Sequence, residues 1–165
     1  MQEKTKKNLM EAFAGESQAN RKYLAFASKA AQEGYPGVAK LFRAAAAAET
    51  VHAHSHLRAL GGINTTKDNL KEAISGETHE FVSMYPKMID EAKADGEKVA
   101  EKSFVFANEV EQIHAGLYKK ALDNLDNFPE KGYYVCSVCG YTVADEAPEK
   151  CPVCGAMKKA FNKVD

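Results

Sequence analysis

Two Glu-x-x-His pairs are the residues in this sequence whose types and spacing point most directly to chemistry. They are Glu49 with His52 and Glu111 with His114. In a helix, residues three apart lie on one face, so each pair presents a carboxylate and an imidazole side by side. A single glutamate precedes each pair at nearly the same spacing, Glu16 before the first and Glu77 before the second. Four carboxylates and two imidazoles suit two divalent ions of hard to borderline character.

These six residues recur in register within an internal repeat. Residues 12–17 read Ala-Phe-Ala-Gly-Glu-Ser, and residues 73–78 read Ala-Ile-Ser-Gly-Glu-Thr. An isolated glutamate is usually a solvated surface residue, and an isolated Glu-x-x-His occurs often by chance. Here, five alanines precede Glu49, and small residues of this kind allow close helix approach rather than forming a charged surface. We therefore predict a di-metal site.

Glu80 breaks the repeat. It lies three residues after Glu77, whereas the equivalent position in the first half is Ala19. The site thus has seven potential ligands. A ferric ion prefers an anionic oxygen and a ferrous ion tolerates the neutral imidazole of His52, so one hypothesis is that a metal exchanges these ligands during redox cycling. The alternative is that Glu80 is solvated or only supports a ligand.

Two tyrosines lie near the predicted ligands in sequence. Tyr23 follows Glu16 by two helical turns, and Tyr85 follows Glu80 by five residues. Each either packs in the core or serves the metal site by hydrogen-bonding a ligand or supplying an electron. Three further histidines lie off the ligand faces or match a residue that is not a ligand in the other half of the repeat, and we exclude them: His54, His56 and His79.

The four cysteines form two Cys-x-x-Cys-Gly turns separated by 11 residues. They are Cys136 with Cys139 and Cys151 with Cys154. Glycine permits the left-handed backbone that such a turn needs, and four thiolates make a tetrahedral site. In a reducing compartment, this cluster favours a metal over disulfides. The spacing indicates a metal but not which one, because zinc ribbons and single-iron sites with four thiolates share it.

The elements that position these residues are mostly helical. Four helices are predicted, at about 3–33, 36–60, 66–94 and 97–125. Pro86 lies inside the third of them and is expected to kink it. A linker follows, and the remaining residues are too few to hold a core without a metal. The predicted domains are residues 1–127 and residues 133–165.

Composition limits the other functional classes. Of the 165 residues, 45% are hydrophobic and 27% are charged, which favours a packed core over disorder. The formal net charge of −1 gives no electrostatic basis for binding nucleic acid or an anionic membrane. No signal peptide and no run of 18 apolar residues is present, so the expected location is cytoplasmic.

Taken together, the sequence resembles the rubrerythrins over essentially its whole length. The motifs that carry the resemblance are Ala14-Gly15-Glu16-Ser17, Glu49-x-x-His52, Glu77-x-x-Glu80 with Met84-Tyr85-Pro86, Glu111-x-x-His114 and the two cysteine turns. The resemblance implies an all-α four-helix ferritin-like bundle, followed by a small metal-stapled, rubredoxin-like knuckle domain. It also implies reduction of hydrogen peroxide to water in oxidative stress defence. Electrons would come from NAD(P)H through a reductase, often with a rubredoxin between.

The family's ligand roles carry over to matching positions. The ligands of two irons would be Glu16, Glu49, His52, Glu77, Glu80, Glu111 and His114. Glu49 and Glu111 would bridge, Glu80 and His52 would alternate, and Tyr23 and Tyr85 would be site tyrosines. One iron would be held by Cys136, Cys139, Cys151 and Cys154.

The short connection between the second and third helices departs from the ferritin-like pattern. Such bundles cross over along their length at this point, a distance of roughly 30 Å between the helix ends. The six residues 61–66 reach at most about 20 Å. Either the bundle is a simple up-down-up-down one, or the two hairpins complete bundles in different chains. We favour the second, a domain-swapped homodimer.

Two other functions remain open from the sequence. A ferroxidase would use the same di-metal ligands but has no need of an appended electron-transfer domain. A non-catalytic metal-binding protein would carry a zinc ribbon in place of the cysteine iron site. The visible spectrum distinguishes the two kinds of cysteine site, since ferric iron bound by four thiolates is red and a zinc site is colourless.

Overall fold

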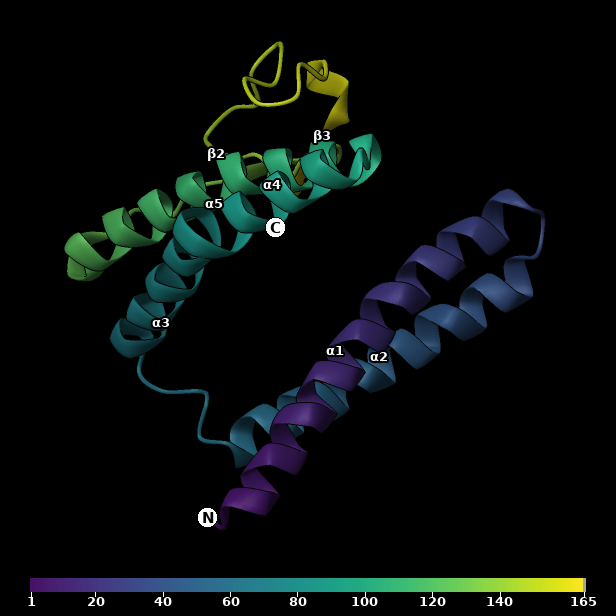
Figure 1. Cartoon of the computed structure of the whole chain (residues 1–165), viewed down its shortest axis with the longest axis vertical. Coiled ribbons are helices and arrows are strands. Elements are labelled where there is room, and N and C mark those ends of the chain that lie inside the picture. Colours follow the sequence, from purple (N-terminus) through teal and green to yellow (C-terminus); the bar gives the residue numbers. More distant parts are fainter. Residues whose placement is uncertain (165) are drawn as a thin grey trace. The chain divides into compact units, whose positions relative to one another are not determined.

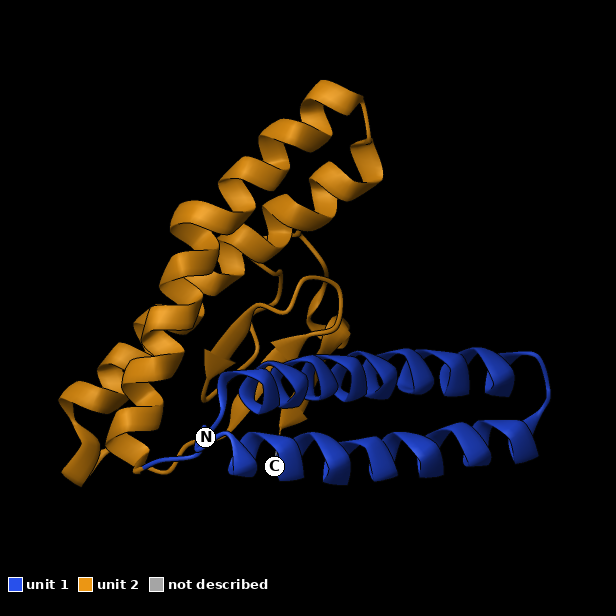
Figure 2. Cartoon of the chain, turned by 60° about the horizontal axis from the view of Figure 1, so that its bottom comes forward, with its two compact units in different colours: residues 1–64 blue, residues 65–165 orange. Residues whose placement is uncertain are grey.

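The computed structural model describes residues 1–164 and divides into two compact units, residues 1–64 and residues 65 onward (Figure 2). None of the helices in the described residues is long and apolar enough to cross a membrane. The predicted domain boundaries at residues 127 and 133 rest on composition and chemistry, and they stay a prediction.

The first unit is a helical hairpin. Helix α1 (Glu3–Gln32) and helix α2 (Pro36–Ala59) lie side by side (Figure 1). The turn between them contains Gly34 at φ 83°, and Pro36 opens α2, where a missing N–H costs no hydrogen bond. The buried residues between the helices are almost all alanines, and the one buried polar residue is Asn20. Small side chains bring the two backbones close together.

The second unit begins with three helices and a π-helical turn. They are α3 (Thr66–His79), η1 (Glu80–Met84), α4 (Tyr85–Asp95) and α5 (Lys98–Asp123). The hydroxyl of Thr65 accepts a hydrogen bond from the amide of Asp68 and so caps α3. Gly96 ends α4 in the left-handed conformation at φ 75°.

A π-helical turn divides the predicted third helix. The chain forms five residues of π-helix just before Pro86, and the predicted kink stays a prediction. The amide of Tyr85 donates to the carbonyl of Glu80, five residues back, instead of the usual four. Pro86 has no N–H to donate. The regular hydrogen-bonding pattern of the helix is therefore interrupted where the proline begins the next helical turn.

A small three-stranded antiparallel sheet completes the second unit. Its strands are β1 (Tyr133–Cys136), β2 (Thr142–Ala144) and β3 (Phe161–Val164), in the order β2-β1-β3. Short 3₁₀ turns lie at Leu125–Asn127 and Lys158–Ala160. The rings of Tyr141 and Phe161 meet edge to face at 6.2 Å beside the cysteine turns. Strand β2 contacts α5, so the sheet is docked on the helix that carries His114.

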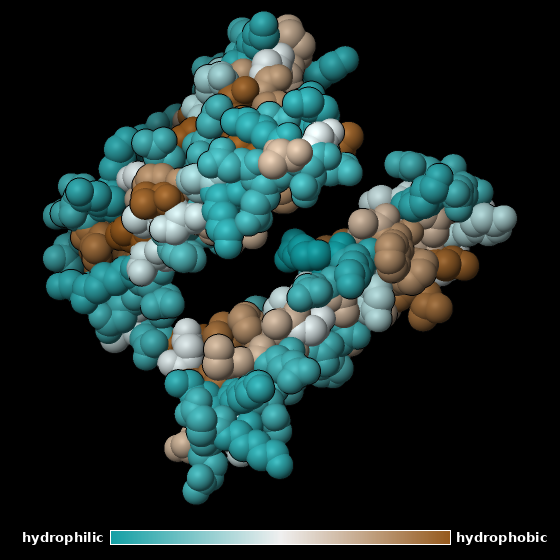
Figure 3. All heavy atoms as spheres, viewed as in Figure 1, coloured by the Kyte–Doolittle hydropathy of each residue, from teal (hydrophilic) through white to brown (hydrophobic). Residues whose placement is uncertain are grey.

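The first unit leaves large apolar side chains exposed, as Figure 3 shows along the α1–α2 hairpin. Leu41 is 69% exposed and Val51 63%, while the residues buried between the two helices are mainly alanines. Two helices that bury mainly alanines remove little apolar surface from water. A helical hairpin of this kind needs a further layer to cover its apolar face.

Candidate metal centre

The first unit gathers three of the predicted ligands. Glu16 comes from α1, and Glu49 and His52 come from α2. Nδ1 of His52 lies 2.8 Å from a carboxylate oxygen of Glu49 and 4.0 Å from one of Glu16. One donor atom from each residue lies within 4.8 Å of the others, which is the spacing of groups that share a metal ion.

The second unit repeats this arrangement. Nδ1 of His114 lies 2.8 Å from an oxygen of Glu111 and 3.9 Å from one of Glu77. The corresponding distances in the two units are nearly equal. The internal repeat of the sequence is therefore also a repeat of donor geometry. In both units Nδ1, rather than Nε2, is the imidazole nitrogen that faces the carboxylates.

The electrostatic surroundings of Glu77 are those expected of a carboxylate that binds a cation. Burial raises the pKa of Glu77 to about 7, with further contributions from a hydrogen bond to Glu111 and from the charges of Glu111 and Glu80. Crowded carboxylates oppose ionisation in each other's presence, and a divalent ion bound between them would remove that opposition. Such a perturbed cluster is a marker of a functional site.

This shift predicts a pH dependence of the metal-free protein. The pKa of Glu77 rises from 4.5 to about 7 on folding, so the folded state holds the proton more tightly. Stability is therefore expected to fall as pH rises from 4.5 through about 7, by on the order of 2 kcal/mol. Urea unfolding of metal-free protein across this range measures it. Glu77→Gln should flatten the profile, whereas the exposed Glu72→Gln should retain it; equal slopes in all three proteins would contradict the assignment.

Glu80 lies at the start of the π-helical turn and outside the group formed by Glu77, Glu111 and His114. Burial raises its pKa, and the charge of Glu111 adds to the effect. The charge of Glu111 therefore reaches Glu80, although Glu80 does not share the close spacing of the other three donors. π-Helical turns inside α-helices are frequent at functional sites. The predicted exchange of Glu80 with His52 stays a prediction.

The two predicted tyrosines have different surroundings. Tyr23 packs against Phe26 and Phe42, with ring centroids 6.4 and 6.1 Å away. Burial raises the pKa of Tyr85, and the charges of Glu111, Glu80 and Glu77 raise it further. Tyr85 therefore lies within the electrostatic reach of the second unit's carboxylates.

Sequence reasoning missed a third tyrosine. Burial raises the pKa of Tyr118, and the charges of Glu77 and Glu111 raise it further. Tyr118 follows Glu111 by seven residues, two helical turns along the same face of α5, and this spacing is the signal that could have found it.

Thr142 was also missed. Its hydroxyl oxygen lies 3.0 Å from Nε2 of His114, and the same hydroxyl is 3.0 Å from the carbonyl oxygen of Gly140. His114 is 26% exposed and is held at both ring nitrogens, whereas His52 is 56% exposed. Within residues 1–164, no hydrogen bond reaches Nε2 of His52. The two histidines thus make the same contacts to carboxylates at Nδ1, but they differ in the surroundings of Nε2.

The four cysteines converge on one point. Sγ of Cys136 is 3.7 Å from that of Cys154, and Sγ of Cys139 is 3.6 Å from that of Cys151. A tetrahedron with metal–sulfur bonds of about 2.3 Å has edges of about 3.8 Å, so the sulfur positions fit a metal and exceed disulfide length. Both iron and zinc match this geometry.

Backbone amides aid ionisation of these thiols, as the turns predict. Burial opposes ionisation of Cys151, but hydrogen bonds from the amides of Cys154 and Val153 help to bring its pKa below the ordinary value. Burial raises the pKa of Cys139, against a hydrogen bond from the amide of Tyr141. A bound cation would favour the thiolate at each position.

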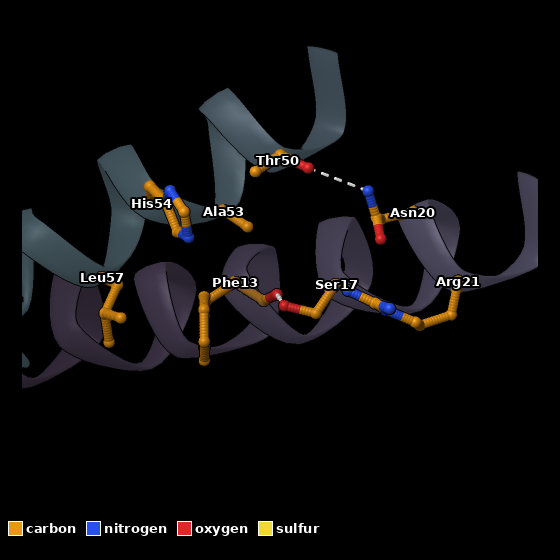
Figure 4. A pocket seen from close by; sticks show the side chains of 8 residues that line it. All are labelled: Phe13, Ser17, Asn20, Arg21, Thr50, Ala53, His54 and Leu57. Atoms are coloured by element: carbon orange, nitrogen blue, oxygen red, sulfur yellow. Dashed lines mark hydrogen bonds between the residues drawn. The ribbon is translucent and has the colours of Figure 1, made fainter. Parts of the chain in front are cut away.

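A separate pocket in the first unit contains none of the predicted ligands. It has a volume of about 220 Å³ (Figure 4) and is lined by Phe13, Ser17, Asn20, Arg21, Thr50, Ala53, His54 and Leu57. The amide nitrogen of Asn20 donates to the carbonyl of Ala46 at 2.7 Å and to the hydroxyl of Thr50 at 2.9 Å. These bonds hold α1 to α2, so the polar residues that form them stabilise the helical hairpin. His54 lines this pocket and not the carboxylate group, in agreement with its exclusion.

Comparison with known proteins accounts for nearly the whole chain. A family model described as rubrerythrin matches residues 7–122, and one for the rubredoxin-like domain of rubrerythrin matches residues 134–162. Rubrerythrin-2 of Clostridium acetobutylicum is 37% identical, with 93% of this chain and 92% of that protein aligned. Nigerythrin of Nitratidesulfovibrio vulgaris is 33% identical over 95% of this chain and 85% of its own length. A solved structure of nigerythrin in a mixed-valence state aligns at 33% identity with a TM-score of 0.60, covering 97% of this chain and 86% of that one.

These matches, with the four helical segments and the cysteine cluster, confirm the predicted fold class: four helices of ferritin-like type followed by a small three-stranded domain that carries a four-cysteine cluster. Both carboxylate–histidine groups and the four-cysteine cluster are able to bind metal.

Proposed function

The chain belongs to the rubrerythrin family, and from this premise we propose that it reduces hydrogen peroxide to water at a di-iron site, with electrons supplied through the four-cysteine site. The observation that carries the proposal is the docking of the cysteine domain on α5, where Thr142 contacts His114. An electron-transfer domain that touches a metal ligand suits a redox enzyme better than a metal store.

The residues around the carboxylates have defined tasks in this proposal. Glu16, Glu49, Glu77 and Glu111 neutralise the metal charge, and His52 and His114 complete the donor set. Iron, when bound there, supplies the electrons that split the O–O bond. Tyr85 and Tyr118 have raised pKa values, so they keep their protons and can donate hydrogen bonds beside the carboxylates. These donors orient an oxygen ligand and assist proton delivery.

We further propose that the complete site combines two chains. Each unit supplies three donors of the six, and the first unit leaves apolar side chains exposed that require a covering layer. Helix α2 ends at Ala59 and α3 begins at Thr66, so only six residues connect the two units. That connection is too short for a lengthwise crossover. A homodimer in which the first unit of one chain joins the second unit of the other satisfies these constraints.

The physiological electron donor is proposed from family membership alone. A reductase that uses NAD(P)H, directly or through a rubredoxin, would deliver electrons to the cysteine site. The proposed metals are two irons in the carboxylate site and one in the cysteine site. Metal analysis with a visible spectrum tests the latter, since a zinc-loaded cysteine site would be colourless and unable to carry electrons.

The peroxidase proposal predicts a preference for peroxide over oxygen. The anaerobically reduced, iron-loaded protein is mixed with stoichiometric hydrogen peroxide or with oxygen, and oxidation is followed by stopped-flow absorbance. Peroxide is expected to oxidise the protein at least about tenfold faster. A Glu111→Gln variant, which retains the cysteine iron, controls for direct oxidation of that site. Oxygen reacting as fast as peroxide, with turnover of added ferrous iron, would instead favour a ferroxidase.

A further inference from the structure

We propose that Thr142 is a positioning residue for the metal ligand His114, a role that rests on the proposed di-metal site. The geometry has two parts. Nδ1 of His114 faces Glu111 and Glu77 at 2.8 and 3.9 Å, and Nε2 is 3.0 Å from the hydroxyl oxygen of Thr142. A neutral imidazole that offers Nδ1 to a metal must carry its proton on Nε2, so His114 donates and Thr142 accepts.

The hydrogen bond from Thr142 to Gly140 fixes the direction of the bond between His114 and Thr142. The Thr142 hydroxyl lies 3.0 Å from the carbonyl oxygen of Gly140, which only accepts. The single hydroxyl proton is therefore committed to Gly140, and the oxygen lone pairs face His114. With this polarity fixed, a neutral ring cannot carry its single proton on Nδ1 without losing the bond to Thr142.

The same pair of bonds ties the two metal sites of one chain together. Gly140 directly follows Cys139, a predicted thiolate ligand, so a continuous covalent and hydrogen-bonded route runs from the cysteine cluster through Thr142 to His114. All of these residues lie in the second unit. The cysteine domain therefore serves the histidine of its own chain, whichever chain supplies the other half of the site.

His52 differs from His114 in the surroundings of Nε2. In the described residues, His52 has the same contacts to its carboxylates but no hydrogen bond at Nε2. Thr142 thus holds the ring of His114 on the side that faces away from the carboxylates.

The test uses Thr142→Val, with zinc as the probe. Thr142 and His114 both line a largely apolar pocket of about 450 Å³. Alanine would admit a water molecule as a substitute acceptor, whereas valine fills the hydroxyl's place with a methyl group. Zinc has no redox chemistry, so the result stands whether or not the protein reduces peroxide. The cysteine site is filled with zinc first, and binding at the carboxylate site is then titrated.

Thr142→Val is expected to weaken zinc binding at the carboxylate site about 10- to 100-fold. It should also abolish the slowly exchanging Nε2–H signal of His114 in ¹H–¹⁵N spectra of the imidazole. Thr142→Ser should restore both. Ser137→Ala removes another hydroxyl–carbonyl bond of the same small domain, a bond of 2.8 Å to Ala160, and should change neither. Wild-type zinc affinity and an unchanged Nε2–H signal in Thr142→Val would overturn the proposal.

Discussion

A one-to-one mixture of Glu49→Gln and Glu111→Gln chains, unfolded and refolded together, is expected to regain about a quarter of the wild-type carboxylate metal sites. Each variant alone should bind little metal there, because every site lacks one of its predicted carboxylate ligands. In a swapped dimer, half of the dimers would be mixed. One site in each mixed dimer would then pair an intact first unit with an intact second unit.

The measurement is metal per chain after the cysteine site has been saturated. A matched control mixes Glu16→Gln with Glu49→Gln, which both damage the first unit, so no pairing of chains creates an intact site. That mixture should recover nothing. Absence of recovery in the first mixture, with chain exchange verified by tagged wild-type protein, would contradict the swapped dimer and indicate a bundle closed within one chain.

Replacing one thiolate should unfold the small domain while leaving the helices intact. Cys151→Ser is expected to lose the metal held by the four cysteines, and with it the red colour of the proposed ferric site. The sheet has strands of three or four residues, and a metal bound by four thiolates contributes on the order of 10 kcal/mol to folding. No core of this size replaces that contribution.

Amide hydrogen exchange across residues 133–164 measures the loss, and circular dichroism reports the helices. Val138→Ala, in the same turn region but 57% exposed, should leave exchange unchanged. The Cys151→Ser variant should also bind zinc more weakly at the carboxylate site, because the domain that holds Thr142 against His114 is lost. Protected amides in a metal-free Cys151→Ser protein would show that the domain folds without its metal.

Much of the site was predictable from the sequence because its information is local. The three-residue spacing of a Glu-x-x-His pair places both side chains on one face of a helix. The internal repeat then shows the same set of residues in each half of the chain. The helix bounds followed for the same reason: Gly34 and Pro36, for example, mark the first turn by backbone preference alone. The cysteine cluster, too, follows from two short turns of known shape.

The features that sequence reasoning missed depend on contacts between distant segments. Thr142 matters only because the sheet docks on α5, and nothing in the residues around it signals that position. Tyr118 occupies the repeat position of His56, a histidine excluded from the site, and only the structure shows that the charges of Glu77 and Glu111 reach it. The π-helical turn arises from how the hydrogen bonds before Pro86 are rearranged, which a proline alone does not specify.

The π-helical turn also bears on the history of the chain. The two halves match closely from the start of the second helix of each hairpin, because Glu49 and Glu111 lie at the same offset from it. Upstream they differ, since the helical segment continues farther beyond Glu77 than the first helix does beyond Glu16. An insertion into a helix is absorbed as a π-helical turn, and this one begins at Glu80, the ligand candidate that the first half lacks. Duplication of one ancestral hairpin, followed by an insertion in the second copy, would account for the longer helical segment, whereas Glu80, which aligns with Ala19, requires a separate substitution.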